Sequence, residues 1–256
     1  MIPLLSLRKA ALLVAALAAG ARLLAQGAPP MLTDDTAPPD PGELEVSVGM
    51  TTEHTPGATA MEAPALDLAY GIHKNVELGY SVAWTGEHAS GESSRWGLGK
   101  SEVDIKWRFI GDGEHGLQMA FTPAIEFPTP GSRAVDRGIV EPHTYWKLPF
   151  EIQGEVGDYG LCAEVGPVLA TNREDENSWE GGFVVSRDIV KGWTLCAEIH
   201  GATDDRAKQS EWIFNIGSVI KLSEKYNLLL AAGRDLSNSM GEKVSFLGYV
   251  GVQTTF

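Results

Sequence analysis

The stretch KSEVDIKWRF, residues 100–109, alternates charged and apolar side chains along its whole length. Successive side chains of an extended strand point to opposite faces, so one face would carry Lys100, Glu102, Asp104, Lys106 and Arg108. The other face would carry Ser101 and the apolar side chains of Val103, Ile105, Trp107 and Phe109. The stretch therefore predicts a strand that separates two very different surroundings.

The same two-residue pattern repeats through the rest of the chain, with no apolar stripe of helical spacing after the first 25 residues. Compact turns alternate with longer connections rich in Pro, Ser and charge, which is typical of an outer-membrane barrel. We therefore predict an all-β fold, a closed antiparallel up-and-down transmembrane β-barrel of about 12 strands, over residues 43–256. The predicted strands are 43–53, 61–70, 75–85, 96–109, 117–127, 140–153, 159–170, 179–189, 193–202, 210–222, 226–234 and 244–256.

Alternation alone does not distinguish such a barrel from a soluble secreted β-sandwich that binds a ligand. The polar faces mix Gly, Ala, Ser and charges of both signs, which suits a crowded interior better than a solvated surface. Tryptophans fall near predicted strand ends, where a membrane–water boundary satisfies both the ring and its N–H. The predicted aromatic girdle consists of Trp84, Trp96, Trp107, Trp146, Trp179, Trp193 and Trp212.

The two ends of the chain indicate export. Arg8 and Lys9 precede the apolar run 11–20, which is shorter than the roughly 20 residues that span a bilayer. We expect a signal peptide over 1–25, cleaved near residue 21 or 25, and a Pro/Asp-rich periplasmic leader over 26–42. The last strand ends in Phe256, which we expect the barrel assembly machinery to read as an assembly signal. The predicted location is the outer membrane, with its lipid around the barrel.

Composition excludes several classes of function. The 256 residues carry a net charge of −14, which argues against nucleic acid as a partner. Cys162 and Cys196 have one predicted strand between them, which places their Cα atoms roughly 10 Å apart, beyond disulfide reach. No cysteine spacing typical of a metal site is present, and we expect neither a metal nor another cofactor.

If the apolar faces contact lipid, the charged faces line the lumen. The reverse arrangement would cost ~2–4 kcal/mol for each Arg or Lys near the middle of the bilayer. Carboxylates outnumber cations among these residues, so an open lumen would disfavour anions. The predicted lumen-lining residues are Glu45, Asp67, Glu77, Lys100, Glu102, Asp104, Lys106, Arg108, Glu126, Lys147, Glu151, Glu164, Glu198 and Lys221.

A barrel enzyme acting on envelope lipid is an alternative to a channel. His200 lies near Asp204 and Asp205 at a predicted strand end, as a catalytic base could. No G-x-S-x-G nucleophile motif accompanies it, and a catalytic triad is defined by geometry rather than by the presence of its residues. We therefore assign no catalytic residue and expect a channel or transporter for small solutes, not an enzyme.

Several segments resemble a family of bacterial outer-membrane barrels named for the meta-pathway of phenol degradation. The resemblance implies a closed outer-membrane barrel that passes small, hydrophobic or aromatic compounds, and it implies no catalytic residue. The matching segments are LTDD (32–35), PGELEVSV (41–48), EAPALDLAYGIHKNVELGYSVAW (62–84), GLGKSEVDIKWRF (97–109), GIVEPHTYWKLPFEIQ (138–153), EIHGATDD (198–205) and NIGSVIKLSEKYNLLLAAGRDL (215–236).

Overall fold

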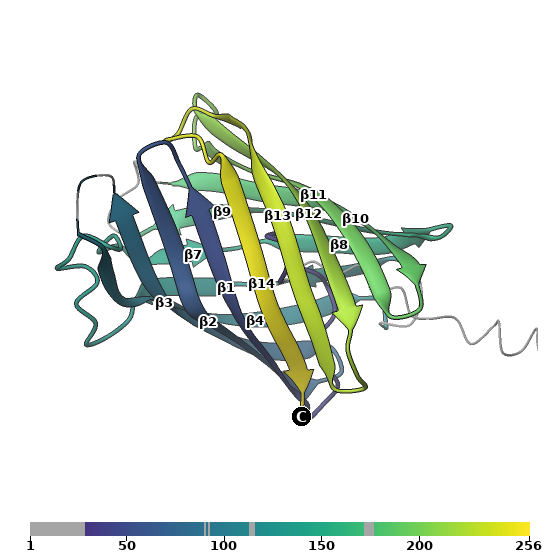
Figure 1. The fold of residues 1–256 in the computed structure, drawn as a ribbon. Coiled ribbons are helices and arrows are strands. Elements are labelled where there is room, and N and C mark those ends of the chain that lie inside the picture. Colours follow the sequence, from purple (N-terminus) through teal and green to yellow (C-terminus); the bar gives the residue numbers. More distant parts are fainter. Residues whose placement is uncertain (1–28, 90, 92, 113–115, 172–176) are drawn as a thin grey trace, which may run out of the picture.

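The computed structural model describes residues 29–89, 91, 93–112, 116–171 and 177–256, and these form one closed antiparallel β-barrel (Figure 1). The expected signal peptide lies outside the described residues. Within them, no helix is long and apolar enough to cross a membrane. The strands are β1 (Leu44–His54), β2 (Ala58–His73), β3 (Val76–Ala89), β4 (Arg95–Ile110), β5 (Gln118–Phe121), β6 (Ala124–Pro128), β7 (Tyr145–Lys147), β8 (Phe150–Val156), β9 (Tyr159–Ala170), β10 (Ser178–Val190), β11 (Trp193–Asp204), β12 (Ser210–Lys221), β13 (Tyr226–Asn238) and β14 (Phe246–Thr255).

The barrel closes because its last strand pairs with its first. β14 and β1 run antiparallel with Glu45 opposite Thr255 and His54 opposite Phe246. β5 with β6, and β7 with β8, each form one interrupted span, so the wall has 12 spans, which confirms the predicted fold class. A single sheet closed on itself also excludes the alternative of two packed sheets in a β-sandwich.

Two neighbouring spans are broken in the middle, where uninterrupted strands over 117–127 and 140–153 were predicted. The breaks fall at Thr122–Pro123 and Leu148–Pro149. Proline has no N–H to donate to a neighbouring strand, so a proline interrupts the hydrogen-bond ladder. Thr122 N still donates to Pro149 O at 3.2 Å, and Leu148 N donates to the carbonyl of Pro167 at 3.1 Å. The wall therefore stays bonded around the kink.

The two ends of the barrel differ in their connections. Two-residue turns at 74–75, 157–158 and 191–192 lie at the end that carries the C-terminus (Figure 1). Gly157 and Gly192 adopt positive φ angles of 63° and 78°, which tight hairpin turns require and glycine adopts without strain. Longer connections, including 129–144 and 239–245, lie at the opposite end.

The two faces of β4 have opposite character. Lys106 and Arg108 point inward and are 4% and 5% exposed, whereas Ile105 and Trp107 point outward and are 49% and 54% exposed. The outer faces of the other strands carry similarly exposed apolar side chains, among them Leu78, Phe150, Val165, Phe183, Ile199, Ile216 and Val250. The outside of the barrel is therefore apolar and its interior largely polar.

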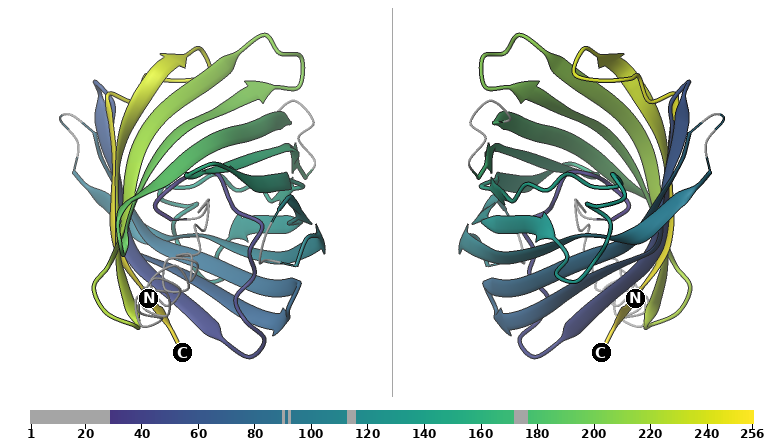
Figure 2. Two further views of the ribbon diagram at one scale, coloured as in Figure 1. Left: turned by 90° about the vertical axis from the view of Figure 1, so that its right-hand side faces the viewer. Right: turned by 90° about the vertical axis from the view of Figure 1, so that its left-hand side faces the viewer.

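Residues 29–43, here called the internal segment, lie within the barrel and cross its lumen before joining β1 (Figure 2). Met31 packs against Cys162, Val184 and Cys196 in a small apolar cluster on the inner wall. Both cysteines are buried and free, as the predicted separation required. The internal segment is thus part of the packed interior.

The broken spans generate a prediction about Gly166 on β9. A Cβ atom on Gly166 would overlap the carbonyl of Leu148 and the ring of Pro149, whereas a Cβ on Gly154 would meet nothing closer than 3.9 Å. We expect Gly166→Ala to lower the free energy of unfolding by about 1–3 kcal/mol, the usual cost of overpacking. Gly154→Ala is the matched control and should cause no such loss. Urea unfolding of the folded barrel in vesicles measures both, and equal midpoints would contradict this account of the kink.

Candidate functional site

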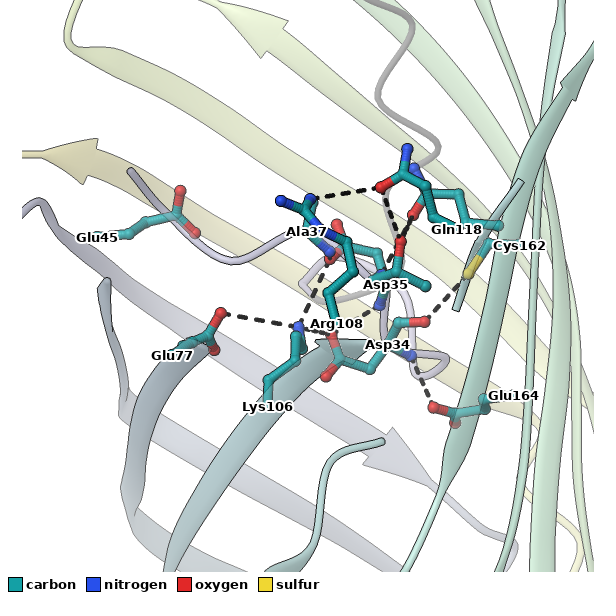
Figure 3. Close-up of polar contacts among 12 residues, drawn as sticks. Asp34, Asp35, Ala37, Glu45, Glu77, Lys106, Arg108, Gln118, Cys162 and Glu164 are labelled. Carbon is teal, nitrogen blue, oxygen red and sulfur yellow. Dashed lines mark hydrogen bonds and ion pairs between the residues drawn. The ribbon is translucent and has the colours of Figure 1, made fainter. Parts of the chain in front are cut away.

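Lys106 is a buried cation on the inner face of β4, and the internal segment supplies most of its counter-charge. Its Nζ lies 3.0 Å from Asp34 Oδ1, 3.5 Å from Asp35 Oδ1 and 3.9 Å from Glu77 Oε2 (Figure 3). Removing an ammonium group from water costs several kcal/mol unless partners compensate it. Two of its three carboxylate partners come from the internal segment, so this ion cluster fixes the segment to β4.

Carboxylates of the opposite wall accept main-chain N–H groups of the same segment. Glu198 Oε1, on β11, accepts from Leu32 N at 3.0 Å and from Thr33 N at 2.6 Å. Glu164 Oε2, on β9, accepts from Asp34 N at 2.9 Å (Figure 3). Hydrogen bonds to an ionised carboxylate are stronger than those between neutral groups. The wall thus holds the backbone of the segment as well as its side chains.

Further along, the internal segment contacts two more parts of the wall. Thr36 donates its main-chain N–H to Gln153 Oε1 at 3.2 Å, and its hydroxyl lies 3.3 Å from Gln118 Oε1. The carbonyls of Pro39 and Asp40 then pass so close to Gly71 that a side chain there would overlap them. The segment is therefore attached to the wall along its length, from β11 round to β2.

Among the titratable groups of the internal segment, Asp35 has the pKa that burial shifts most. Burial raises the pKa of Asp35 to about 6, although the ammonium of Lys106 lowers it. A solvated Asp titrates near 3.8, so the seated segment binds this proton more tightly than a withdrawn one. The contribution of Asp35 therefore favours seating as the pH falls below about 6.

Four predicted lumen residues form a separate ion-pair network on β4, β6 and β7. Lys147 Nζ lies 2.7 Å from Glu102 and 2.9 Å from Glu126, and Lys100 Nζ lies 2.8 Å from the other oxygen of Glu126. Lys100 also lies over the ring of Tyr145, 4.2 Å from its centroid. These pairs join neighbouring strands of the wall, and none of the four residues forms a described ion pair with the internal segment.

Two neighbouring cavities lie within the described part of the lumen. The larger, of about 670 Å³, is bounded by the internal segment and by wall residues that include the predicted Glu45, Asp67, Asp104 and Glu164. The smaller, of about 350 Å³, is lined by the Lys100–Lys147 network together with Glu62 and Tyr249. Both are lined by more carboxylates than ammonium and guanidinium groups. The lumen is thus a polar, predominantly acidic space that the internal segment narrows.

Of the remaining predicted residues, Arg108 and His200 line the larger cavity, Glu151 lies opposite Glu164 on the neighbouring strand, and Lys221 lies near the short-turn end of the barrel. Arg108 donates to the carbonyl of Lys74 at 2.7 Å, at the turn before β3. Glu151 is buried in the wall, and Lys221 lies at the end of β12, where it pairs with Glu224 at 2.9 Å. His200 lies on the inner wall, 3.5 Å from Glu164, where it lines the larger cavity.

The predicted girdle residues divide between the two rims. Trp84, Trp96, Trp146, Trp179 and Trp212 lie towards the long-loop end, and Trp107 and Trp193 towards the short-turn end. All of them are exposed on the outside except Trp96, which is half-buried against Gly86. Phe256 ends the chain and exchanges main-chain hydrogen bonds with Leu44 of β1.

Sequence reasoning missed the partners from the internal segment, chiefly Met31, Asp34, Asp35 and Thr36. The segment has no periodicity, so nothing local indicated where its side chains would point. One signal was available: Lys106 is a cation on an inward face, and a buried cation needs carboxylates near it. The acidic pair of LTDD could have been considered for that role.

The closed wall, the polar lumen and the apolar exterior together define the outer-membrane class of barrel folds. No protein-family model and no curated protein matches the chain. It is similar to the solved structure of an outer membrane channel from Pseudomonas putida F1, with a TM-score of 0.70 and 13% identity over 87% of this chain and 98% of that one. It is also similar to the KdgM porin (TM-score 0.58, 12% identity, 82% of this chain and 99% of that one) and to the NanC porin (0.55, 8%, 82% and 98%).

The ion cluster generates a prediction about Lys106. Lys106→Met leaves Asp34, Asp35 and Glu77 close together without their cation, so we expect the internal segment to leave its seat. Cys162, whose thiol donates to Asp34 O at 3.1 Å, would then become accessible. We expect a small thiol reagent to label Cys162 roughly tenfold faster or more, because breaking a buried ion pair costs several kcal/mol.

Lys100→Met is the matched control, because it removes a lumen cation that does not touch the segment. Its labelling rate should stay near that of the parent protein. Equal labelling in the parent protein and in Lys106→Met would show that the ion cluster does not hold the segment.

Proposed function

We propose that this protein is an outer-membrane channel for small solutes, in which the internal segment is a movable constriction. One observation carries the proposal: the closed barrel has a polar lumen with cavities beside the internal segment. Polar contacts hold this segment in place. The segment is held largely by ion pairs and hydrogen bonds, and water or a polar solute can replace such contacts when the segment moves. A solute could therefore pass when these contacts open.

The apolar exterior supports placement in the outer membrane. Side chains such as Ile105, Phe150 and Val165 are about half exposed on a continuous outer face, which a lipid bilayer would cover. The similarity to outer-membrane barrels supports the same location. We infer that residues 129–144 face the cell exterior and that the short turns and the C-terminus face the periplasm.

The solute is small, because the internal segment leaves cavities of only about 670 and 350 Å³. The acidic lining supports cationic or neutral solutes over anions. The resemblance of the sequence to barrels named for phenol degradation supports aromatic compounds among the candidates.

The position of His200 does not favour the alternative of a lipid-directed enzyme. His200 lies inside the lumen, where it lines the larger cavity and contacts Glu164, on the opposite side of the wall from the outer face that lipid would cover. A lipid ester would have to enter the barrel to reach it. We therefore keep the channel as the proposed function.

Conductance in planar bilayers tests the channel. We expect the full chain to pass Na⁺, with a conductance several-fold higher for the double variant Asp34→Asn, Asp35→Asn, in which Lys106 loses both partners from the segment. Asp40→Asn is the control, because Asp40 is an exposed acid of the same segment that makes no described contact with Lys106. Indistinguishable currents from lipid alone and from every variant would rule the channel out.

The membrane placement generates a prediction about two adjacent residues, Asp104 and Ile105. Ile105→Arg would put a cation into hydrocarbon between the rim at Trp107 and the middle of the bilayer, at a cost of up to ~2–4 kcal/mol. Asp104→Asn keeps hydrogen-bonding capacity in a polar lumen, so it should cost much less. Urea unfolding from lipid vesicles compares them, and equal destabilisation would overturn the assignment of the two faces of β4.

A further inference from the structure

Glu198 is a buried carboxylate, 1% exposed, and no lysine, arginine or histidine of the described residues lies within ion-pair distance of it. The donors to its oxygens that the structure describes are neutral: Leu32 N, Thr33 N and Asn215 Nδ2, the last at 2.9 Å. A buried charge is costly unless an opposite charge compensates it. Glu198 is therefore suited to a positively charged donor.

A second observation next to Glu198 also points to a donor. Asn215 is 1% exposed, and its Oδ1 atom has no hydrogen-bond partner among the described residues. This oxygen occupies the place that a Cβ atom on Gly233 of β13 would take, so it packs against the neighbouring strand without a donor. Buried polar atoms are nearly always paired, so an unpaired acceptor needs an explanation. A ligand with several N–H groups would provide its partner.

Glu164 is a second hydrogen-bond acceptor on the same part of the inner wall, and with Glu198 it forms a surface that accepts N–H groups. Glu164 lies opposite Gly182 of β10, and Gly182 lies opposite His200 of β11, two residues beyond Glu198. Gly182 has no side chain to fill this surface, and Thr33 of the internal segment packs directly onto it. The segment thus sits on a floor bounded by two carboxylates and presents N–H groups to both.

We propose that Glu164 and Glu198 form a subsite for the ammonium group of a small solute, and that this solute competes with residues 32–34 for the two carboxylates. An ammonium group offers up to three donors, as the three main-chain N–H groups do, and adds the positive charge that they lack. The proposal rests on the proposed channel function and names the solute class as organic amines. Lys106 and Gln153 hold other parts of the segment, so the ammonium group needs to displace only the attachment to Glu164 and Glu198.

The carboxylates that line the larger cavity would favour entry of a cation as far as this subsite. Glu164 and His200 line the 670 Å³ cavity, which continues to Glu45, Asp67 and Asp104 on the other side of the lumen. These carboxylates raise the local concentration of cations. A primary amine entering the lumen would thus meet acidic groups before it reaches Glu164 and Glu198.

The experiment uses the full chain and two probe cations, methylammonium and tetramethylammonium. Both carry one positive charge, but only methylammonium has N–H donors. Labelling of Cys162 reports displacement of the segment, because Asp34 O covers its thiol. We expect methylammonium to accelerate labelling roughly tenfold relative to tetramethylammonium at equal concentration, the effect of one or two hydrogen bonds to a charged group.

The variants Glu198→Gln and Glu151→Gln locate the effect. Glu198→Gln keeps an acceptor for the N–H groups of the segment but removes the charge, so the methylammonium response should disappear. Glu151→Gln removes an equally buried wall carboxylate that accepts none of the described N–H groups of the segment, so the response should remain. Equal responses to the two cations, or a full response in Glu198→Gln, would overturn the proposal.

A second measurement covers the case in which Glu198→Gln unseats the segment by itself and labels rapidly without any probe. In the Lys106→Met background, the reversal potential under opposing gradients of the two cations gives their permeability ratio. We expect this ratio to fall several-fold on adding Glu198→Gln and to persist on adding Glu151→Gln; an unchanged ratio after adding Glu198→Gln would overturn the subsite.

The same recordings distinguish failure of the subsite from failure of the channel. Conduction of Na⁺ without any methylammonium preference would overturn this inference alone, whereas absence of conduction in all variants would count against the channel itself.

Discussion

A wall that spans a bilayer must satisfy its main-chain N–H and C=O groups within the sheet itself, because hydrocarbon offers them no partner. In this chain the pairing of β14 with β1 removes the last free edges. Closure then divides the side chains into two sets, because alternate residues point outward to apolar surroundings or inward to a confined space. The charges on the inner face are thereby crowded together, and the interior must be arranged so that they are compensated.

The internal segment provides much of that compensation. Asp34 and Asp35 neutralise Lys106, while the N–H groups of residues 32–34 satisfy Glu164 and Glu198. The same short stretch thus offers negative side chains to a cation and positive backbone dipoles to two carboxylates. Such complementarity explains why a Pro/Asp-rich stretch without secondary structure occupies a defined place in the lumen.

In the proposed channel, stability and transport are coupled, because the groups that hold the internal segment would also line the path of a solute. A cation bound at the proposed subsite of Glu164 and Glu198 would weaken the contacts of the segment at the same wall position. The Lys100–Glu126–Lys147–Glu102 network, by contrast, stays paired within the wall. The lumen therefore contains one set of charges that pair within the wall and another that, in the proposed channel, would exchange partners with a solute.

Local pattern determined the barrel, because a strand with period two and one apolar face has few ways to satisfy its backbone in a membrane. KSEVDIKWRF predicted the two faces of β4, and the strand count and closure followed from the same rule applied along the chain. Pro123 and Pro149 can be read from the sequence, but only the register of the neighbouring spans brings the two breaks side by side. The seat of the internal segment was decided only by tertiary structure. Asp34 lies 72 residues from Lys106 and 130 from Glu164, and only closure brings these wall residues around one point in the lumen.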